Sequence, residues 1–230
     1  MKNLTYLFLL VACLTSCGEL SESYVIKGSS SVSQLDGRKM YLKVLKDKEL
    51  TNFDSCEVVH GKFQFSGSLD TTTMMASLFM DYQSLMPVVI EKGDISVFID
   101  NGKQKVSGTP LNDKLYGFMD QVTRLQNEMQ ELDHKYNQML LDGIDEMEAD
   151  RTVSKEIAAI MHQEDSLVTN FVTSNFDNLL APFVFVQMAS SIPQIEQIMT
   201  NAPDAFKNDP IVSDFYKNVT ESTNGHENAD

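Results

Sequence analysis

The chain has 230 residues, of which 33 are Asp or Glu and 18 are Lys or Arg, giving a formal charge of −15 at pH 7. A phosphate backbone is bound by clustered Lys and Arg, and here basic residues such as Lys43, Lys46 and Lys48 form no such block. Composition therefore argues against nucleic acid and anionic lipid as partners. A hydrophobic content of 42% is sufficient for one large or two small folded domains.

The N-terminus has the pattern of a secretory signal peptide. Met1–Asn3 supply a positive charge, and Leu4–Leu14 is an almost unbroken apolar run. A run of about eleven residues is too short to cross a ~30 Å hydrocarbon core as a helix. A permanent transmembrane segment is therefore disfavoured.

The sequence Leu14-Thr15-Ser16-Cys17 resembles the end of a bacterial lipoprotein signal, in which cleavage precedes a diacylglyceryl-modified cysteine. This resemblance implies removal of residues 1–16, lipidation of Cys17 and a tether over residues 17–23. Two or more acyl chains hold a protein stably on a membrane. Because Gly18 is no obvious retention signal, we expect an outer-membrane anchor facing the periplasm, with surface exposure left open. The alternative is an ordinary secreted protein.

Cysteine usage limits redox chemistry. Cys13 leaves with the signal peptide and Cys17 would be acylated, so Cys56 would be the only free thiol. With a single free thiol, the sequence predicts no disulfide within the chain. Because it contains no Cys-x-x-Cys, it also predicts no thioredoxin-type centre of its own. Asp54 and Glu57 are expected to raise the pKa of Cys56. We interpret Cys56 as a small, half-buried strand residue.

Residues 24–108 are predicted to form an antiparallel β-sandwich or open barrel, since short strand patterns alternate with turn residues. Arg38–Leu45 places Met40, Leu42 and Val44 on one face. A hairpin is predicted from Cys56–Val59, a His60-Gly61 turn and Lys62–Gly67, with Phe63 and Phe65 on one face. The other strands are expected at Tyr24–Gly28, Met75–Tyr82, Met86–Glu91, Ile95–Asp100 and Lys105–Gly108.

Residues 109–219 are predicted to be helical, so the fold class is α+β. Thr109 is expected to cap the first helix, with Pro110 in its first turn and Asp113 complementing its dipole. Apolar residues then follow at alternating spacings of four and three, which is typical of a heptad seam. The seam comprises Leu111, Leu115, Phe118, Val122, Leu125, Met129, Leu132, Tyr136 and Met139.

A second helix is expected to begin near Thr152 or Ser154, after a stop at Asp142-Gly143. The short connection favours an antiparallel helical hairpin. The second seam comprises Val153, Ile157, Ile160, Leu167 and Phe171, with Glu164 intruding. The seam either packs within the chain or forms a coiled-coil surface for another subunit.

The C-terminal part is predicted to hold short helices. Leu179–Met188 is expected to be a buried helix, with a strand over Phe183–Val186 as the alternative. Pro193–Met199 and Pro210–Val219 are predicted amphipathic helices capped by Ser191 and Asp209. Residues 220–230 lack apolar content and are expected to be a disordered tail.

Three segments, Gly61–Gly67, Val89–Ile95 and Val106–Asp113, together resemble a β-rich domain of unknown function. That domain precedes a thioredoxin-like, AhpC/TSA-type domain in many Gram-negative envelope lipoproteins. The resemblance extends through the helices to about residue 219. Where the thioredoxin-like domain would begin, this sequence has Thr220–Gly225 and ends, so no redox residue carries over. The resemblance implies an accessory module and supplies no ligand.

Other site patterns are incomplete. Glu131-Leu132-Asp133-His134 has the Glu-x-x-His spacing of di-metal bundles, but His162 lacks a matching Glu. The acidic stretch Asp142–Asp150 departs from EF-hand spacing and is interpreted as a solvated loop, with weak calcium binding as the alternative. We therefore expect no catalytic residue, metal or cofactor.

The sequence therefore predicts a lipid-anchored, non-catalytic binding or scaffold module of the cell envelope, with a membrane contact through Cys17 and an envelope protein as partner. One alternative is an accessory component of an envelope thiol–disulfide system. Another is an enzyme with carboxylate chemistry, for which Glu164 is the best candidate because an acid on an apolar seam has a raised pKa or a partner. Oligomeric state is left open.

Overall fold

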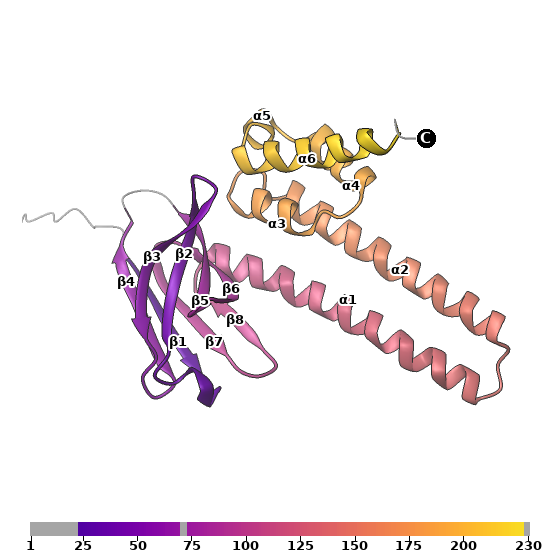
Figure 1. Ribbon diagram of the computed structural model, residues 1–230, viewed down its shortest axis with the longest axis horizontal. Helices are drawn as coiled ribbons and strands as arrows, with labels where there is room; N and C mark the ends of the chain where they lie inside the picture. The colour runs from indigo at the N-terminus through magenta and orange to yellow at the C-terminus, as the bar shows by residue number, and fades with distance from the viewer. Residues whose placement is uncertain (1–22, 70–72, 228–230) are drawn as a thin grey trace, which may run out of the picture.

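The first half of the chain forms two four-stranded β-sheets and the second half is helical, as Figure 1 shows. The computed structural model describes residues 23–69 and 73–227. The α+β prediction is confirmed within this part of the chain. The predicted signal peptide, Cys17 and the tether up to residue 22 lie outside the described residues.

The first sheet has the order β4-β1-β7-β8 and the second has the order β3-β2-β5-β6. Neighbouring strands are antiparallel except β1 and β7, which are parallel. The strands are β1 (Ser23–Ser30), β2 (Lys39–Lys46), β3 (Glu49–Glu57), β4 (Lys62–Ser68), β5 (Met74–Met80), β6 (Gln83–Ile90), β7 (Gly93–Ile99) and β8 (Gln104–Ser107). A short 3-10 helix, η1 (Ser33–Leu35), separates β1 from β2.

The buried faces of the two sheets share one hydrophobic core. Met40 and Leu42 of β2 are fully buried, as their alternation predicts, and Val44 is half-buried against the same core. Phe63 and Phe65 of β4 also point inward, with their ring centroids 6.0 Å apart. The period-two pattern therefore identified the inner faces of these strands.

The predicted β-hairpin around His60-Gly61 is wrong in its pairing. Both turn residues have positive φ, and Val59 and Lys62 exchange backbone hydrogen bonds of 2.8 and 3.1 Å. Beyond this single bridge, β3 pairs with β2 and β4 pairs with β1, so the chain changes sheet. The prediction missed most of β3 because the sequence of this strand is polar. The two-residue Asp47-Lys48 turn after β2 fixes the register in which β3 pairs with β2.

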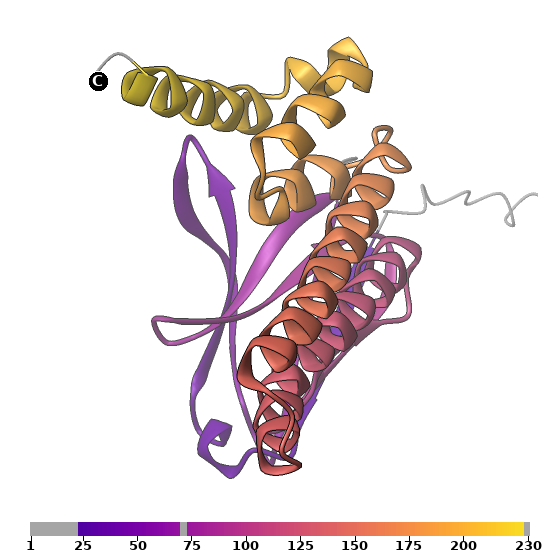
Figure 2. The ribbon, with the colours of Figure 1, turned by 90° about the vertical axis from the view of Figure 1, so that its right-hand side faces the viewer.

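Helices α1 (Pro110–Leu141) and α2 (Glu146–Thr173) form the predicted antiparallel hairpin, which projects from the sheets (Figures 1 and 2). The outer seam residues form a second core cluster, separate from the main core. Its buried members are Leu125, Leu132, Val153 and Ile160. The seam therefore packs within the chain.

The acidic stretch after Gly143 is a helix N-terminus, which corrects the predicted loop. Asp145 accepts a hydrogen bond of 3.1 Å from the backbone N–H of Met147, and α2 begins at Glu146 instead of near Thr152. Glu146 and Glu148 lie in its first turn, where carboxylates are favoured by the helix dipole.

Four helices complete the chain: α3 (Leu180–Met188), α4 (Ile192–Asn201), α5 (Asp204–Lys207) and α6 (Pro210–Glu227). The helical prediction for Leu179–Met188 is confirmed, and its strand alternative is wrong. Ser191 and Asp209 accept hydrogen bonds from the helix N-termini that follow them, as predicted. Helix α6 continues beyond Val219 to Glu227, where the sequence predicts a disordered tail from residue 220.

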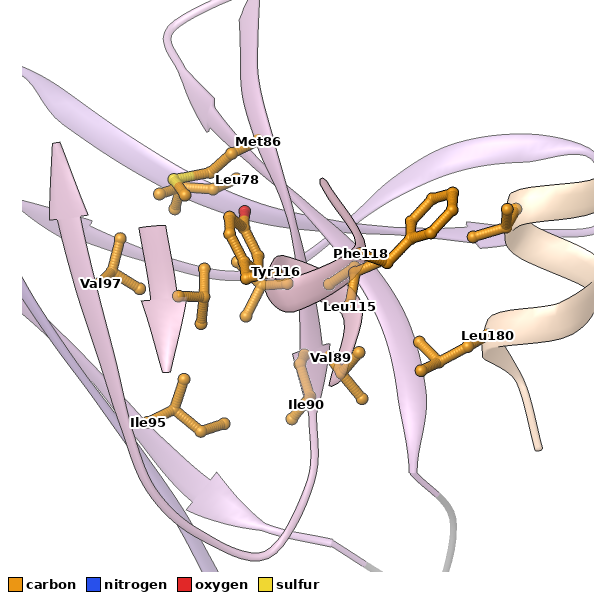
Figure 3. Close-up of a cluster of buried hydrophobic side chains, with 14 of the residues drawn as sticks. Leu78, Met86, Val89, Ile90, Ile95, Val97, Leu115, Tyr116, Phe118 and Leu180 are labelled. Atoms are coloured by element: carbon orange, nitrogen blue, oxygen red, sulfur yellow. The ribbon is translucent and has the colours of Figure 1, made fainter. Parts of the chain in front are cut away.

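The helices and sheets are joined by a continuous core. Figure 3 shows Phe118 of α1 and Leu180 of α3 beside Val89 of β6. Val89 is fully buried because helices cover the outward face of the second sheet at this point. The base of the hairpin is therefore fixed to the sandwich, whereas its outer half extends away from it.

Candidate functional site

The base of the hairpin is held by a buried polar junction at the start of α1. Glu91, which follows β6, accepts hydrogen bonds from the backbone N–H groups of Leu111 and Asn112 at 2.9 and 3.0 Å. A carboxylate at this position satisfies two otherwise unpaired donors and complements the helix dipole. Asn112 then binds the backbone N–H and C=O of Val89 at 2.9 and 2.8 Å.

The predicted role of Thr109 is therefore corrected. Thr109 occupies the N-cap position of α1, but its hydroxyl makes no capping hydrogen bond. The hydroxyl instead accepts a 2.9 Å hydrogen bond from the Asn112 side chain. Glu91, which follows β6, accepts the hydrogen bonds that a capping residue would normally accept. Sequence spacing could not identify this because Glu91 lies about twenty residues before the helix it caps.

Two aromatic contacts strengthen the base. The Tyr116 hydroxyl donates a 2.8 Å hydrogen bond to the carbonyl of Pro87, and burial raises the pKa of this tyrosine. Phe118 of α1 stacks on Phe171 of α2, with ring centroids 4.2 Å apart. The hairpin is thus fixed to β6 and internally braced where it leaves the sandwich.

The far end of the hairpin carries exposed apolar side chains, which we call the tip patch: Leu140, Leu141, Ile144 and Met147. Leu141 and Met147 are 82% and 78% exposed. The chain reverses at Gly143, whose φ of +82° suits glycine, and the backbone N–H of Ile144 bonds the carbonyl of Met139 at 3.0 Å. The turn holds these side chains at the surface.

The tip patch is surrounded by negative charge. Asp142, Asp145, Glu146 and Glu148 lie within the same nine-residue stretch, and no Lys or Arg occurs from Tyr136 to Asp150. An apolar patch with charge of one sign at its rim is typical of a protein interaction surface. The tip patch can therefore bind an apolar surface that is surrounded by basic groups.

The sequence contains a signal for the tip patch that the heptad analysis did not use. After Met139, the alternating spacing would continue at Gly143 and Glu146, neither of which is apolar. Leu140, Leu141, Ile144 and Met147 lie off the seam. In the outer half of the hairpin the two helices bury the seam against each other, and these four residues are exposed.

A second apolar surface lies between the β2–β3 turn and the C-terminal helices. This groove has a volume of about 400 Å³ and its walls include Leu45 and Leu50 on one side and Phe183 and Ile211 on the other. Leu45 and Leu50 are paired across β2 and β3. An ion pair between Lys48 and Asp214 of α6 links the two walls.

Cys56 is a free, half-buried thiol on β3. Its pKa is raised from 9.0 to about 11, chiefly by burial, while a backbone hydrogen bond at Gln64 lowers the pKa and Asp54 contributes a smaller rise. The predicted direction is confirmed, although burial is the larger cause. A thiol with this pKa is protonated at neutral pH and is therefore a poor nucleophile.

The remaining candidate residues are dispersed. Glu164 is half-buried on α2, and Glu131, His134 and His162 are exposed on the hairpin. Among the residues that the structure describes, no three His, Cys, Asp or Glu side chains lie together as metal ligands would. In the same described ranges, no helix has the length and apolar content needed to cross a membrane.

Part of the chain matches the model of a known family. Residues 24–115 match the model of a family described as a domain of unknown function (DUF4369). The match includes both sheets, the Glu91 junction and the first residues of α1, and it ends before the outer hairpin. No curated protein matches the chain.

Proposed function

We propose that this chain is a lipid-anchored binding module of the cell envelope that holds a protein partner at the tip of its helical hairpin. The observation that supports this proposal is the tip patch, in which apolar side chains are exposed at the end of a rigid projection. Exposing such residues in water is unfavourable, so their position indicates a surface that is covered when a partner binds.

The partner is expected to present an apolar pocket with Lys or Arg at its rim. Leu141 and Met147 would fill the pocket, and the unbranched Met side chain adapts to its shape. The four carboxylates beside them would meet basic groups, which favours the correct orientation and a fast encounter. The same carboxylates disfavour insertion of the tip into an anionic membrane surface.

The dimensions of the chain are consistent with a spacer. From Leu125 to Leu141 the outer half of α1 spans about 25 Å at 1.5 Å per residue. A tether over residues 17–22 would reach at most about 20 Å, so an anchor on Cys17 would keep the sandwich close to the membrane. The module would then present its partner at a limited distance from that surface.

Photocrosslinking in intact cells tests the tip. With benzoylphenylalanine in place of Ile144, we expect a discrete adduct that an excess of unlabelled protein competes away. The double variant Leu141→Ser/Met147→Ser should lose this adduct. Met161 is 56% exposed on the shaft of α2, so Met161→Ser is a matched control that should retain it.

Two results would contradict the proposal. The first is an adduct of equal yield from a probe at Gln130, which is exposed on the shaft, because this would indicate nonspecific contact. The second is an adduct that survives loss of both tip side chains. Circular dichroism of each variant should be unchanged, because the tip patch is outside both core clusters.

The anchor is tested separately. Intact mass of the membrane-bound protein should show an acylated N-terminus at Cys17, and Cys17→Ser should move the protein to the soluble fraction. A soluble wild-type protein that lacks acyl chains would exclude the anchor. That result would leave the tip proposal to be decided by crosslinking.

The alternative function is that of an accessory to an envelope thiol–disulfide system. What favours it is the match of residues 24–115 together with the sequence resemblance to proteins whose next domain is thioredoxin-like. In this case the crosslinked partner should contain a Cys-x-x-Cys motif. Deletion of the gene should also shift the thiol redox state of envelope proteins, and an unchanged redox state would exclude this alternative.

A further inference from the structure

The outward face of the first sheet brings together lysines from three segments that are distant in sequence. Lys27 on β1 is paired with Ser96 on β7, and Ser29 is paired with both Lys62 and Phe98. On β8, Lys105 is paired with Phe98 and Ser107 is paired with Ser96. Strand register therefore assembles a surface that alternates lysine and serine around one aromatic ring.

These residues line a hollow of about 550 Å³, which we call the lysine hollow. Its charged groups are Lys27, Lys62, Lys105 and Lys103, the last from the turn between β7 and β8. That turn is organised by Asp100, which accepts hydrogen bonds from the backbone N–H groups of Gly102 and Lys103. Phe98 lies in the hollow and is 42% exposed.

The hollow remains positively charged after its ion pairs are considered. Lys27 pairs with Asp94 at 2.7 Å, and Lys105 lies 3.9 Å from Asp120 of α1. Among the described residues, Lys62 and Lys103 take part in no ion pair. In a chain of charge −15, four of the 18 basic residues thus lie around one hollow. This arrangement attracts an anionic ligand.

We propose that the lysine hollow binds an acidic oligosaccharide, a chain of sugars that carry carboxylates. Lysine ammonium groups would bind the carboxylates, and the serine hydroxyls at positions 29, 96 and 107 would exchange hydrogen bonds with sugar hydroxyls. The exposed ring of Phe98 offers an apolar surface for the C–H face of one sugar. The site is separate from the tip patch and does not depend on its function.

Two features favour a saccharide over other polyanions. An acidic peptide that adds to a sheet needs a free strand edge, but β1 and β7 are the central strands and are paired on both sides. A lipid surface is flat, whereas these lysines and Phe98 surround a hollow that a planar array of headgroups would not fill. A flexible chain of sugars can follow the floor of the hollow across the strands.

The expectation from composition was that nucleic acid and anionic lipid are poor partners for the chain. That expectation rested on the absence of a block of basic residues along the sequence. Lys27 and Lys62 are distant in sequence from Lys103 and Lys105, and the pairing of β1 with β4 and β7 and of β7 with β8 makes them neighbours.

Isothermal titration of the full chain in mild detergent with oligogalacturonate tests the proposal. We expect saturable binding that weakens as salt increases. The double variant Lys62→Gln/Lys103→Gln should weaken binding about tenfold and reduce the salt dependence. Phe98→Ser should weaken binding without changing the salt dependence, since it removes an uncharged contact.

The matched control is Lys39→Gln/Lys155→Gln, which makes the same change in net charge at two exposed lysines outside the hollow. It should bind like the wild type. Absence of binding at low salt would overturn the proposal, as would an equal loss in the control. Equal affinity for polyglutamate or for phosphatidylglycerol vesicles would overturn the saccharide assignment and identify a peptide or a membrane as the ligand. Tip variants should bind oligogalacturonate normally.

Discussion

Glu91 is the residue on which the attachment of the hairpin depends most directly. Its Oε1 atom accepts from the backbone N–H groups of Leu111 and Asn112 and from the Asn112 side chain. Glu91 and Asn112 are buried and Leu111 is half-buried. Glu91→Ala would leave the donors unsatisfied and should lower the free energy of unfolding by about 2 kcal/mol. Urea denaturation measures this loss. Glu91→Gln keeps an acceptor oxygen and should lower the free energy of unfolding by less. Equal losses in the two variants would show that these hydrogen bonds to the side chain do not stabilise the junction.

Cys56 should make stability depend on pH in the alkaline range. Burial raises its pKa from 9.0 to about 11, so the folded protein keeps the proton at pH values where the unfolded chain releases it. This contribution is complete below pH 9 and is lost as pH rises through about 11. The unfolding free energy of the wild type should therefore fall more between pH 8 and 10.5 than that of Cys56→Ser. If the unfolding free energy of the two proteins fell equally with pH, this would contradict the raised pKa of Cys56.

Gly28 is required because of close packing. A Cβ atom at this position would lie 2.1 Å from the ring of Phe63, which is buried on the neighbouring strand. Gly28→Ala should therefore destabilise the protein by about 2 kcal/mol, measured by thermal unfolding. Gly117 of α1 is the matched control, since a Cβ there meets nothing within 4 Å. Gly117→Ala should stabilise the protein by about 0.5–1 kcal/mol because alanine favours a helix.

At the scale of elements, the outer hairpin has its own small core. Leu132 is buried in a cluster whose other buried members also lie on α1 and α2. Leu132→Ala should cost about 2–3 kcal/mol within this unit. Hydrogen exchange should accelerate in the outer hairpin while β1 and β7 remain protected. Uniform acceleration across the chain would show instead that hairpin and sandwich unfold together.

Helices were predicted well because their signals are local. Pro110 lies in the first turn of α1, and Ser191 and Asp209 accept hydrogen bonds from backbone N–H groups two or three residues later. The heptad residues identify the buried face of the hairpin. The Glu91 cap, the pairing of β4 with β1 and the lysine hollow depend on contacts between distant segments. A single sequence does not encode these distances in its spacing, so they could not be predicted. The lipid anchor on Cys17 stays a prediction.

At the scale of the molecule, the region matched by the family model ends earlier in the chain than the folded unit. The match ends at residue 115, but the core that covers Val89 also contains Phe118, Val172 and Leu180. A fragment of residues 23–115 would expose this apolar surface. We expect it to lack the cooperative unfolding transition that residues 23–227 show by circular dichroism. A cooperative transition in the fragment would mean that the sandwich is stable without its helices.

The position of β1 has a consequence for folding during synthesis. This strand emerges first, yet it lies in the centre of its sheet, between β4 and β7. Its last residue, Ser30, is paired with Ile99, so the strand cannot complete its ladders until about seventy further residues have left the ribosome. The first sheet therefore stays open during that interval, although β2 and β3 can already pair across their two-residue turn. The order of the strands thus makes closure of the first sheet a late step of folding.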